Sequence, residues 1–517
     1  MIRQAADLRP LHCRIILIAI ALLLFAMRLE YLLVHCPIDL AGDEAQYWDW
    51  SRRLGLCYYS KGPAIAYIIR ASCAIFGDVM WAVRLPALLF GAGTMIVTYD
   101  CTRRLFASER LALGAALLLQ LVPIVIAGGY LITIDSPLFF CWAIATDLLA
   151  VALFQRKSWA WPVLGAVIGI GSLAKYAMLL YLPIMAGVLL AEDAKVLKTT
   201  GPWITALIGL LCMTPALVWN YEHRWVSLRH VAHQTGAAGG ALSHGNTLET
   251  IGGQIGAAGP TVAVLITAGV IHAYRSRDRR AMFLCNIGIS FLAFNLLASF
   301  VAKVQQNWPA PAYFSLVIVA AWFLATRITT GWRRWRGWLY ASIIIGVGTI
   351  IISRDPTVLF PLARPFTKHD LKSIDLLSRL RGWQECGNQI SADLQSMPSG
   401  SFVLADDYQQ TAEMAFYVRG QPITYCAGPY IGARLSQYDM WPDHRLDSSS
   451  PKIGLDAIYL GKGGDMPSEV PAAFDSIERL PDVVIIVRGV EVKRFRTWKC
   501  RNFKGFHAIG IDSGESY

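Results

Sequence analysis

Residues 15–34 read IILIAIALLLFAMRLEYLLV, and residues 35–48 continue as HCPIDLAGDEAQYW. A helix needs about 20 apolar residues to cross a bilayer, so the first stretch predicts a membrane-spanning helix. Basic residues precede it, as in a signal peptide, but no small-residue cleavage site follows. We therefore expect this helix to stay in the protein, with the acidic pair Asp43-Glu44 just beyond its end.

The composition extends this prediction to the whole chain. Of its 517 residues, 55% are hydrophobic and only 16% are charged, and the mean hydropathy is +0.43. A water-soluble core could not bury so much apolar surface, so a bilayer must solvate much of the chain. The net charge of +11 does not indicate a nucleic-acid partner, because the basic residues form short clusters between apolar runs.

The apolar runs predict a polytopic α-helical membrane protein with about eleven transmembrane helices. The runs lie at 15–34, 82–100, 110–128, 136–154, 160–174, 176–191, 202–221, 259–273, 282–301, 310–326 and 338–353. Lys and Arg cluster in alternate connections, and such loops stay in the cytoplasm. The N-terminus is then cytoplasmic, and the segments 35–81, 222–258 and 302–309 face outward, together with everything after residue 354.

Two domains follow from this reading. Residues 1–353 form the transmembrane domain, whose outward-facing loop 35–81 holds two amphipathic stretches that we expect along the membrane surface. Residues 354–517 form an extracytoplasmic α/β domain. In this domain we expect helices at 371–394 and 410–417, and strands at 401–406, 422–426, 457–460 and 483–487. Its cysteines, Cys386, Cys426 and Cys500, permit one disulfide without requiring it.

The Asp43-Glu44 pair is a candidate for chemistry at the outer membrane interface. A carboxylate at this depth stays ionised and can reach a lipid headgroup. The alternative is structural, because Asp is a favoured N-cap and Glu is common in the first turn that follows. Spacing alone favours the cap.

Two further ionisable groups lie inside or beside apolar runs, Asp135 in LITIDSPL and Lys175 in GSLAKY. Charges at such positions are expensive and usually face a polar cavity. Asp135 could instead cap the helix at Ser136, and Lys175 could extend to the interface. With Lys61 in the first outer loop, these residues place cations and carboxylates at one membrane face. This combination suits transfer from a phosphate.

The remaining outer segments supply weaker candidates. His230 and His233 are three residues apart and would share a helix face, where they could bind a phosphate or a divalent metal. No clear third metal ligand accompanies them, so His233 is only a weak metal candidate. The third outer segment contributes Lys303, Asn307 and Trp308 as candidates for substrate binding.

Taken together, these motifs resemble the GT-C superfamily of membrane glycosyltransferases, in the bacterial branch related to protein O-mannosyltransferases and to the lipid A aminoarabinose transferase. The resemblance covers residues 15 to about 330. Its most specific pieces are Asp43-Glu44 with Tyr47 and Trp48, then Tyr58–Pro63, Arg84–Pro86, Thr133–Leu138, Leu173–Tyr176, Pro215–Asn220 and Asn307–Tyr313.

The resemblance implies roles for individual residues. Asp43 would be the catalytic base or a carboxylate that orients the acceptor. Asp135 would support the site, and Lys61 and Lys175 would hold the donor phosphate. Tyr58, Tyr59 and Glu44 fall in the same matching motifs and are assigned to substrate binding. The lipid A enzyme has an acid immediately before the first-loop lysine, where this chain has Ser60. That departure puts a family metal in doubt, and no cofactor is required.

We therefore expect an inverting glycosyltransferase in a bacterial inner membrane with its C-terminal domain in the periplasm. It would move one sugar from a polyprenyl-phosphate donor to an extracytoplasmic lipid, such as lipopolysaccharide, or to a cell-envelope glycan. Two alternatives stay open. A protein O-mannosyltransferase would share every membrane motif, whereas a transporter for lipid-linked sugars would need paired broken helices in an inverted repeat.

Overall fold

The computed structural model describes residues 10–234, 245–327, 332–365, 371–463 and 466–507, which form two compact units. The first unit comprises residues 1–35, 61–68 and 84–353, and the second comprises residues 36–60, 69–83 and 354–517. The unit boundary after residue 353 is also where the sequence predicts the last helix to end. By contrast, the sequence assigns the loop 35–81 to the transmembrane domain, whereas most of it folds within the second unit.

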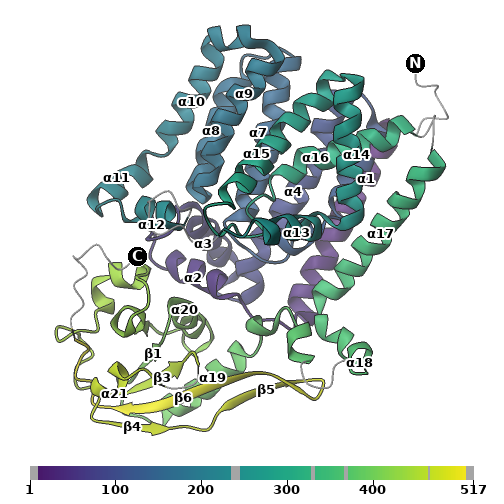
Figure 1. The fold of residues 1–517 in the computed structure, drawn as a ribbon. Helices are drawn as coiled ribbons and strands as arrows, with labels where there is room; N and C mark the ends of the chain where they lie inside the picture. Colours follow the sequence, from purple (N-terminus) through teal and green to yellow (C-terminus); the bar gives the residue numbers. More distant parts are fainter. Residues whose placement is uncertain (1–9, 235–244, 328–331, 366–370, 464–465, 508–517) are drawn as a thin grey trace. The chain divides into compact units, whose positions relative to one another are not determined.

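The first unit is almost entirely helical (Figure 1). Its helices are α1 Pro10–Glu30, η1 Tyr31–His35, α4 Met80–Phe106, α5 Glu109–Leu119, α6 Pro123–Gly128, α7 Asp135–Phe154, α8 Ala160–Ala174, η2 Tyr176–Leu180, α9 Tyr181–Asp193, η3 Ala194–Lys198, α10 Thr200–Cys212, α11 Thr214–Glu222, α12 Val226–Gln234, α13 Thr247–Ala258, α14 Pro260–Ser276, α15 Arg279–Ala298, α16 Ala312–Arg327 and α17 Trp332–Arg354. The start of α3 Ala64–Phe76 and most of α4 belong to this unit.

Every predicted apolar run contains a helix, but the helices differ in length. Among the described residues, six helices are long and apolar enough to cross a membrane, or up to eight if each bent pair counts as one span. The bent pairs are α10 with α11, at 43°, and α13 with α14, at 96°. The sharper bend falls at Gly259, whose φ of +81° favours glycine. The total of about eleven crossings stays a prediction.

Helix α16 is the centre of the first unit, because every residue from Ala312 to Leu324 is buried. It packs against α5, α14 and α15. Glycines allow the close approach: a Cβ at Gly269 would lie 3.0 Å from the Val319 carbonyl oxygen, and one at Gly288 would lie 2.6 Å from Cγ of Leu316. Small residues at helix contacts are typical of membrane bundles, where close van der Waals packing drives association.

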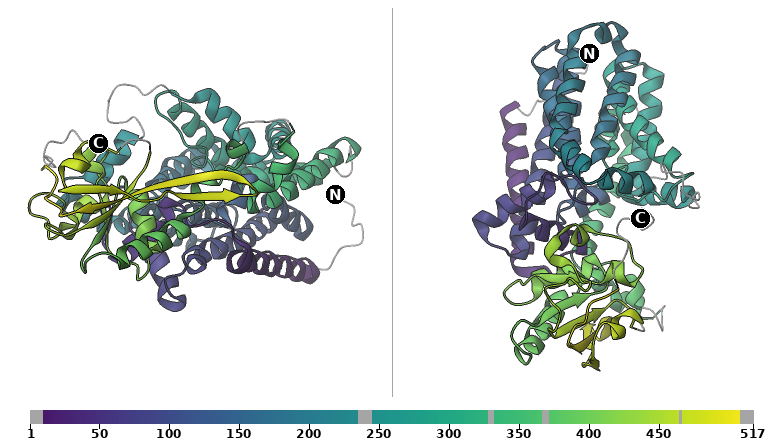
Figure 2. Two further views of the ribbon diagram at one scale, coloured as in Figure 1. Left: turned by 90° about the horizontal axis from the view of Figure 1, so that it is seen from below. Right: turned by 90° about the vertical axis from the view of Figure 1, so that its left-hand side faces the viewer.

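The second unit contains a mixed sheet with the strand order β2-β1-β3-β6-β4, and β5 pairs with β6. The strands are β1 Phe402–Ala405, β2 Thr424–Cys426, β3 Ala457–Gly461, β4 Ser476–Arg479, β5 Val483–Val487 and β6 Val490–Arg501. Strands β1, β2 and β3 are parallel, and β6 is antiparallel to β3, β4 and β5. Figure 2 shows β5 and β6 as a long paired ribbon.

Helices flank this sheet. After residue 370 the described α-helices are α19 Trp383–Gln395, α20 Tyr408–Tyr417 and α21 Glu469–Ala472, and several short 3-10 helices connect the other elements. The strands alternate between two cores: Val403 and Ala405 contribute to one, and Phe402 and Leu404 to the other. The predicted helix at 371–394 is wrong in its first half. Gly382 has a φ of +81°, so the helix starts only after it.

Cys386, Cys426 and Cys500 are all buried and free. They contribute to the second unit as small apolar side chains, Cys386 in one core and Cys500 in the other. The disulfide that the sequence permits is therefore not formed in this structure.

Segments far apart in the sequence meet in the second unit. Helix α2, Gly42–Ser51, packs against α20. The Leu40 amide donates to the Tyr417 hydroxyl at 2.7 Å, and the Trp48 ring meets the Phe416 ring edge-on at 4.8 Å between centroids. Residues 36–60 and 69–83 therefore belong to the same folded unit as the C-terminal residues.

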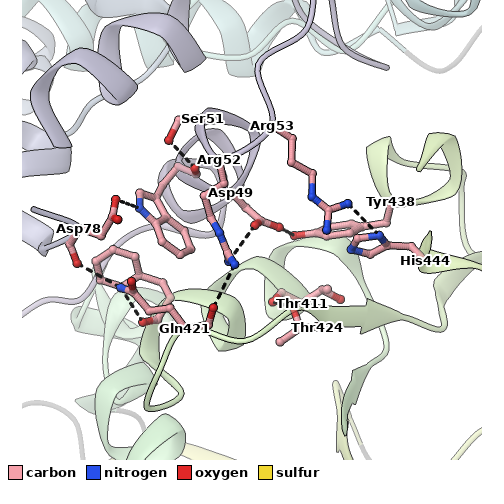
Figure 3. A network of polar contacts seen from close by, with 12 residues as sticks. Asp49, Ser51, Arg52, Arg53, Asp78, Thr411, Gln421, Thr424, Tyr438 and His444 are labelled. Carbon is pink, nitrogen blue, oxygen red and sulfur yellow. Dashed lines mark hydrogen bonds and ion pairs between the residues drawn. The ribbon is translucent and has the colours of Figure 1, made fainter. Parts of the chain in front are cut away.

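A polar network strengthens this packing (Figure 3). The buried Asp49 carboxylate accepts from the Tyr438 hydroxyl at 2.8 Å and from Arg52 at 3.3 Å. Arg53 contacts Nδ1 of His444 at 3.2 Å, and it also donates to the exposed carboxylate of the preceding residue, Asp443, at 2.9 Å. Burial raises the pKa of Asp49, and the neighbouring guanidinium groups oppose that shift. The network holds α2 by both charge and hydrogen bonding.

His444 gives the second unit a predicted pH dependence. Burial lowers the pKa of this histidine from 6.5 to about 4, although Asp443 hydrogen-bonds to it. As the pH falls, the unfolded chain takes up the proton first, so the stability from this group is lost between pH 6.5 and about pH 4. At pH 5 the loss amounts to about 2 kcal/mol.

We therefore expect His444→Phe, which keeps a ring but cannot titrate, to flatten the pH dependence of thermal unfolding between pH 7 and pH 5. The measurement is the unfolding midpoint of the purified protein in detergent. Substitution of the exposed His507 serves as the control and should leave the wild-type profile unchanged. Parallel profiles for wild type and His444→Phe would show that this ring does not remain neutral in the folded protein.

Candidate active site

Three predicted site residues converge within the first unit. Nζ of Lys175 lies 2.6 Å from Oδ1 of Asp135, and Nδ2 of Asn307 donates to Oδ2 of the same carboxylate at 2.6 Å. The side chains of Asp135 and Lys175 are only 18% and 15% exposed. Each carboxylate oxygen therefore has its own donor, and the lysine charge is balanced in a mostly apolar unit.

Helix ends bring these side chains together. Asp135 is the first residue of α7, and its amide donates to the Thr133 hydroxyl at 3.1 Å. Lys175 follows the last residue of α8 in an extended conformation, with φ −148° and ψ 123°. Asn307 lies in the connection between α15 and α16. The alternatives of helix capping by Asp135 and of interfacial extension by Lys175 do not describe this geometry, because both side chains are engaged with each other.

Other groups surround this cluster. The Trp308 ring centroid lies 5.8 Å from Nζ of Lys175, within reach of a cation–π contact. Gly62 packs on the end of α8 so closely that an added Cβ would lie 2.1 Å from the Leu173 carbonyl oxygen. Lys61, which is half-buried, directly precedes Gly62 in the chain. The contact of Gly62 therefore brings Lys61 to the same end of α8 that Lys175 follows.

The acidic pair Asp43-Glu44 belongs to the second unit and divides into two roles. Ala41 is the N-cap of α2, and its amide donates to Oε2 of Glu44 at 2.9 Å. Glu44 is fully buried, so its geometry is that of a capping residue rather than a substrate contact. Asp43 is partly exposed and does not cap the helix. Its Oδ1 accepts from Nε2 of Gln409 at 3.0 Å.

The predicted tyrosines are structural in this geometry. Tyr58 is 1% exposed and stacks on Trp50 with ring centroids 4.5 Å apart. Its hydroxyl lies 3.1 Å from the Trp50 carbonyl oxygen. The Tyr59 amide donates to the Gln437 side chain at 2.7 Å. The two residues thus fix the loop after α2, and neither presents an open surface to a ligand.

The histidines and Lys303 lie elsewhere in the first unit. On α12, His230 is buried and His233 is exposed, although the two share a helix face. Lys303 is exposed and lines a shallow cavity of about 540 Å³, with Asn246, Glu249 and Phe300 on its wall. In the described ranges no three His, Cys, Asp or Glu side chains group as metal ligands would.

Sequence reasoning missed the residues around Asp43. Gln409 and Tyr408 come from the start of α20, and the Arg434 guanidinium lies over the Tyr408 ring at 4.7 Å. Burial and the Asp43 charge raise the pKa of Tyr408 to about 12. Residues 404–409 read LADDYQ, and no local pattern in the sequence relates this segment to Asp43, which precedes Gln409 by 366 positions.

Known proteins with similar sequences include several glycosyltransferases. Residues 60–219 match the family model of dolichyl-phosphate-mannose-protein mannosyltransferase. A lipid A galacturonosyltransferase, RgtD of Rhizobium johnstonii, is 29% identical over 78% of this chain and 82% of its own length. An undecaprenyl phosphate-alpha-4-amino-4-deoxy-L-arabinose arabinosyl transferase of Pseudomonas fluorescens is 28% identical, over 38% of this chain and 39% of its own.

The fold has a close match among solved structures. ArnT from Cupriavidus metallidurans bound to undecaprenyl phosphate aligns with a TM-score of 0.62 and 15% identity, over 94% of this chain and 97% of that chain. The chain is a GT-C superfamily membrane glycosyltransferase. It has the ArnT-like form of the GT-C fold, with a C-terminal sheet, and it is a multi-pass inner-membrane protein.

The Asp135–Lys175 pair predicts a specific pattern of stability changes. Lys175→Met leaves a mostly buried carboxylate without its counterion, which should cost about 3 kcal/mol of unfolding free energy. Adding Asp135→Asn removes the uncompensated charge and keeps a partner for Asn307. The double variant should therefore unfold at a higher temperature than Lys175→Met alone.

The double-mutant cycle compares wild type, Lys175→Met, Asp135→Asn and the double variant. Thermal unfolding of these four proteins is measured in detergent. Arg156→Met is the matched control, because Arg156 pairs with Asp193 at 2.8 Å but is 61% exposed. It should cost less than about 1 kcal/mol. Additive effects at positions 135 and 175 would contradict the pairing.

Proposed function

We propose that this glycosyltransferase transfers one sugar, with inversion, from a polyprenyl-phosphate donor to a lipid A acceptor on the extracytoplasmic side of the inner membrane. The observation that carries the proposal is the cluster of Asp135, Lys175 and Asn307 in the helical unit. A cation at the ends of membrane helices can bind a lipid-linked phosphate. The apolar chain of such a donor stays in the bilayer, so the charge of its phosphate needs a cation near the membrane.

The proposed reaction breaks one bond and forms one. The acceptor hydroxyl oxygen attacks the anomeric carbon of the sugar on the face opposite the phosphate. The bond between that carbon and the phosphate oxygen breaks, and its electron pair leaves with polyprenyl phosphate. A base takes the proton of the acceptor hydroxyl. In this scheme Lys175 and Lys61 stabilise the charge that develops on the departing phosphate.

Two carboxylates have different parts in this proposal. Asp135 holds the Lys175 ammonium through the 2.6 Å contact and is in turn fixed by Asn307, so it orients the cation. Asp43 is the proposed base, because it is partly exposed and Gln409 occupies only one of its two carboxylate oxygens, Oδ1. Glu44, which caps α2, is excluded from this role by its burial.

For the donor sugar we propose a hexuronic acid. The relative that aligns over most of both chains is named as a galacturonosyltransferase, whereas the arabinosyl transferases align over less than half of either. Protein O-mannosylation is the second candidate, because residues 60–219 match a mannosyltransferase family model. The two candidates differ in both sugar and acceptor, so one assay separates them.

This assay uses the full chain, purified and reconstituted in lipid vesicles, with a polyprenyl-phosphate galacturonic acid donor and lipid A. The expected products are free polyprenyl phosphate and lipid A heavier by one hexuronic acid residue, both detected by mass spectrometry. Polyprenyl-phosphate mannose with a peptide acceptor is the competing arm. Transfer in that arm alone would favour the mannosyltransferase alternative.

Asp43→Asn tests the proposed base. Loss of a general base typically costs about 10²–10⁴-fold in rate, and we expect transfer to fall by that factor while the unfolding midpoint stays near that of the wild type. Asp393→Asn is the control, since Asp393 lies on α19 of the same unit and accepts a comparable glutamine hydrogen bond. Full activity of Asp43→Asn would remove Asp43 from the mechanism.

A further inference from the structure

The C-terminal domain touches the proposed base directly. Nε2 of Gln409 donates to Oδ1 of Asp43 at 3.0 Å, and both residues belong to the second unit. The packing behind this contact is tight. A Cβ at Gly42 would lie 2.5 Å from Cβ of Gln409, so only a glycine at position 42 lets the glutamine lie against the start of α2.

The glutamine itself is held in place by its own helix. Asp407 is the N-cap of α20, and its Oδ1 accepts from the amides of Gln409 and Gln410, both at 2.9 Å. Lys462 pairs with the same Asp407 carboxylate at 2.8 Å. Gln409 therefore starts from a fixed backbone position in the first turn of α20.

Further contacts join the segment of α2 to α20. The Leu40 amide donates to the Tyr417 hydroxyl at the far end of α20, and Trp48 packs edge-on against Phe416. Nε1 of Trp48 donates to Asp78 at 2.8 Å. Because α2 is fixed at several points, the Gln409 amide meets the Asp43 carboxylate in a defined direction.

We propose that Gln409 is a positioning residue, which orients the Asp43 carboxylate for proton transfer. This inference rests on the proposed function, in which Asp43 is the base. A neutral amide suits the task. It occupies one carboxylate oxygen and leaves the other for the acceptor hydroxyl, and it adds no charge beside the base. The C-terminal domain thereby contributes to the chemistry of the membrane enzyme.

The test compares variants of the full-length protein in the vesicle transfer assay. Gln409→Ala should lower kcat by about 10- to 100-fold with little change in KM for the donor, because the base loses its orientation and not its ligand. Gln409→Glu replaces the amide by a second carboxylate beside Asp43. Like charges raise the pKa of a carboxyl group, so the acidic limb of the pH–rate profile should move to higher pH.

Gln389→Ala is the matched control. Nε2 of Gln389 donates to Oδ1 of Asp393 at 3.1 Å on the exposed side of α19, so this variant removes the same kind of bond in the same unit. It should leave both kcat and the pH profile at wild-type values. Thermal unfolding midpoints of all variants show whether a lost rate follows lost structure.

Two outcomes overturn the inference, and they are distinguishable. If Asp43→Asn is inactive while Gln409→Ala keeps kcat within twofold, Gln409 does not position the base and the proposed function stands. If Asp43→Asn is active, the proposed function falls and the inference falls with it. Should Gln409→Ala unfold, the nearly isosteric Gln409→Glu decides the matter, because an unshifted acidic limb contradicts the proposed contact.

Discussion

A charge that is removed from water must be paired, and this constraint organises the helical unit. Asp135 and Lys175 come from the ends of two different membrane helices, and Asn307 comes from the connection before α16. Neither charge could stay ionised there alone at an acceptable cost. The pairing therefore ties three separate chain segments together.

In the second unit, residues 36–60 and 69–83 fold together with the C-terminal residues. Residues 36–60 pack with residues after 354 through α2 and α20, through the Asp49–Tyr438 hydrogen bond and through the Arg53–His444 contact. Segments that share a core must lie on the same side of a bilayer. An even number of crossings thus separates residue 60 from residue 354, whichever of the shorter helices complete a span.

The apolar runs predicted where the membrane helices lie, because length and hydropathy are local properties of a sequence. The same reasoning singled out Asp135 and Lys175, since a charge inside an apolar run is conspicuous. Sequence reasoning could not show that Glu44, and not Asp43, caps α2, or that Tyr58 is buried. Strands β4 and β6 were missed because β6 is rich in Lys and Arg, and its burial depends on pairing with β3. Gln409 is a polar residue on a helix, and only tertiary structure relates it to Asp43.

The distance along the chain between α2 and its partner helix also bears on biosynthesis. Asp43 and Gln409 are 366 residues apart, and residues 84–353 of the first unit lie between the early and the late parts of the second unit. At typical translation rates the early loop waits roughly 20–70 s for the strands and helices that complete its core. Until then Trp48 lacks Phe416 and Asp49 lacks Tyr438, so a ribosome that stalls before the last third of the message leaves an inserted bundle with an unfinished, protease-sensitive loop.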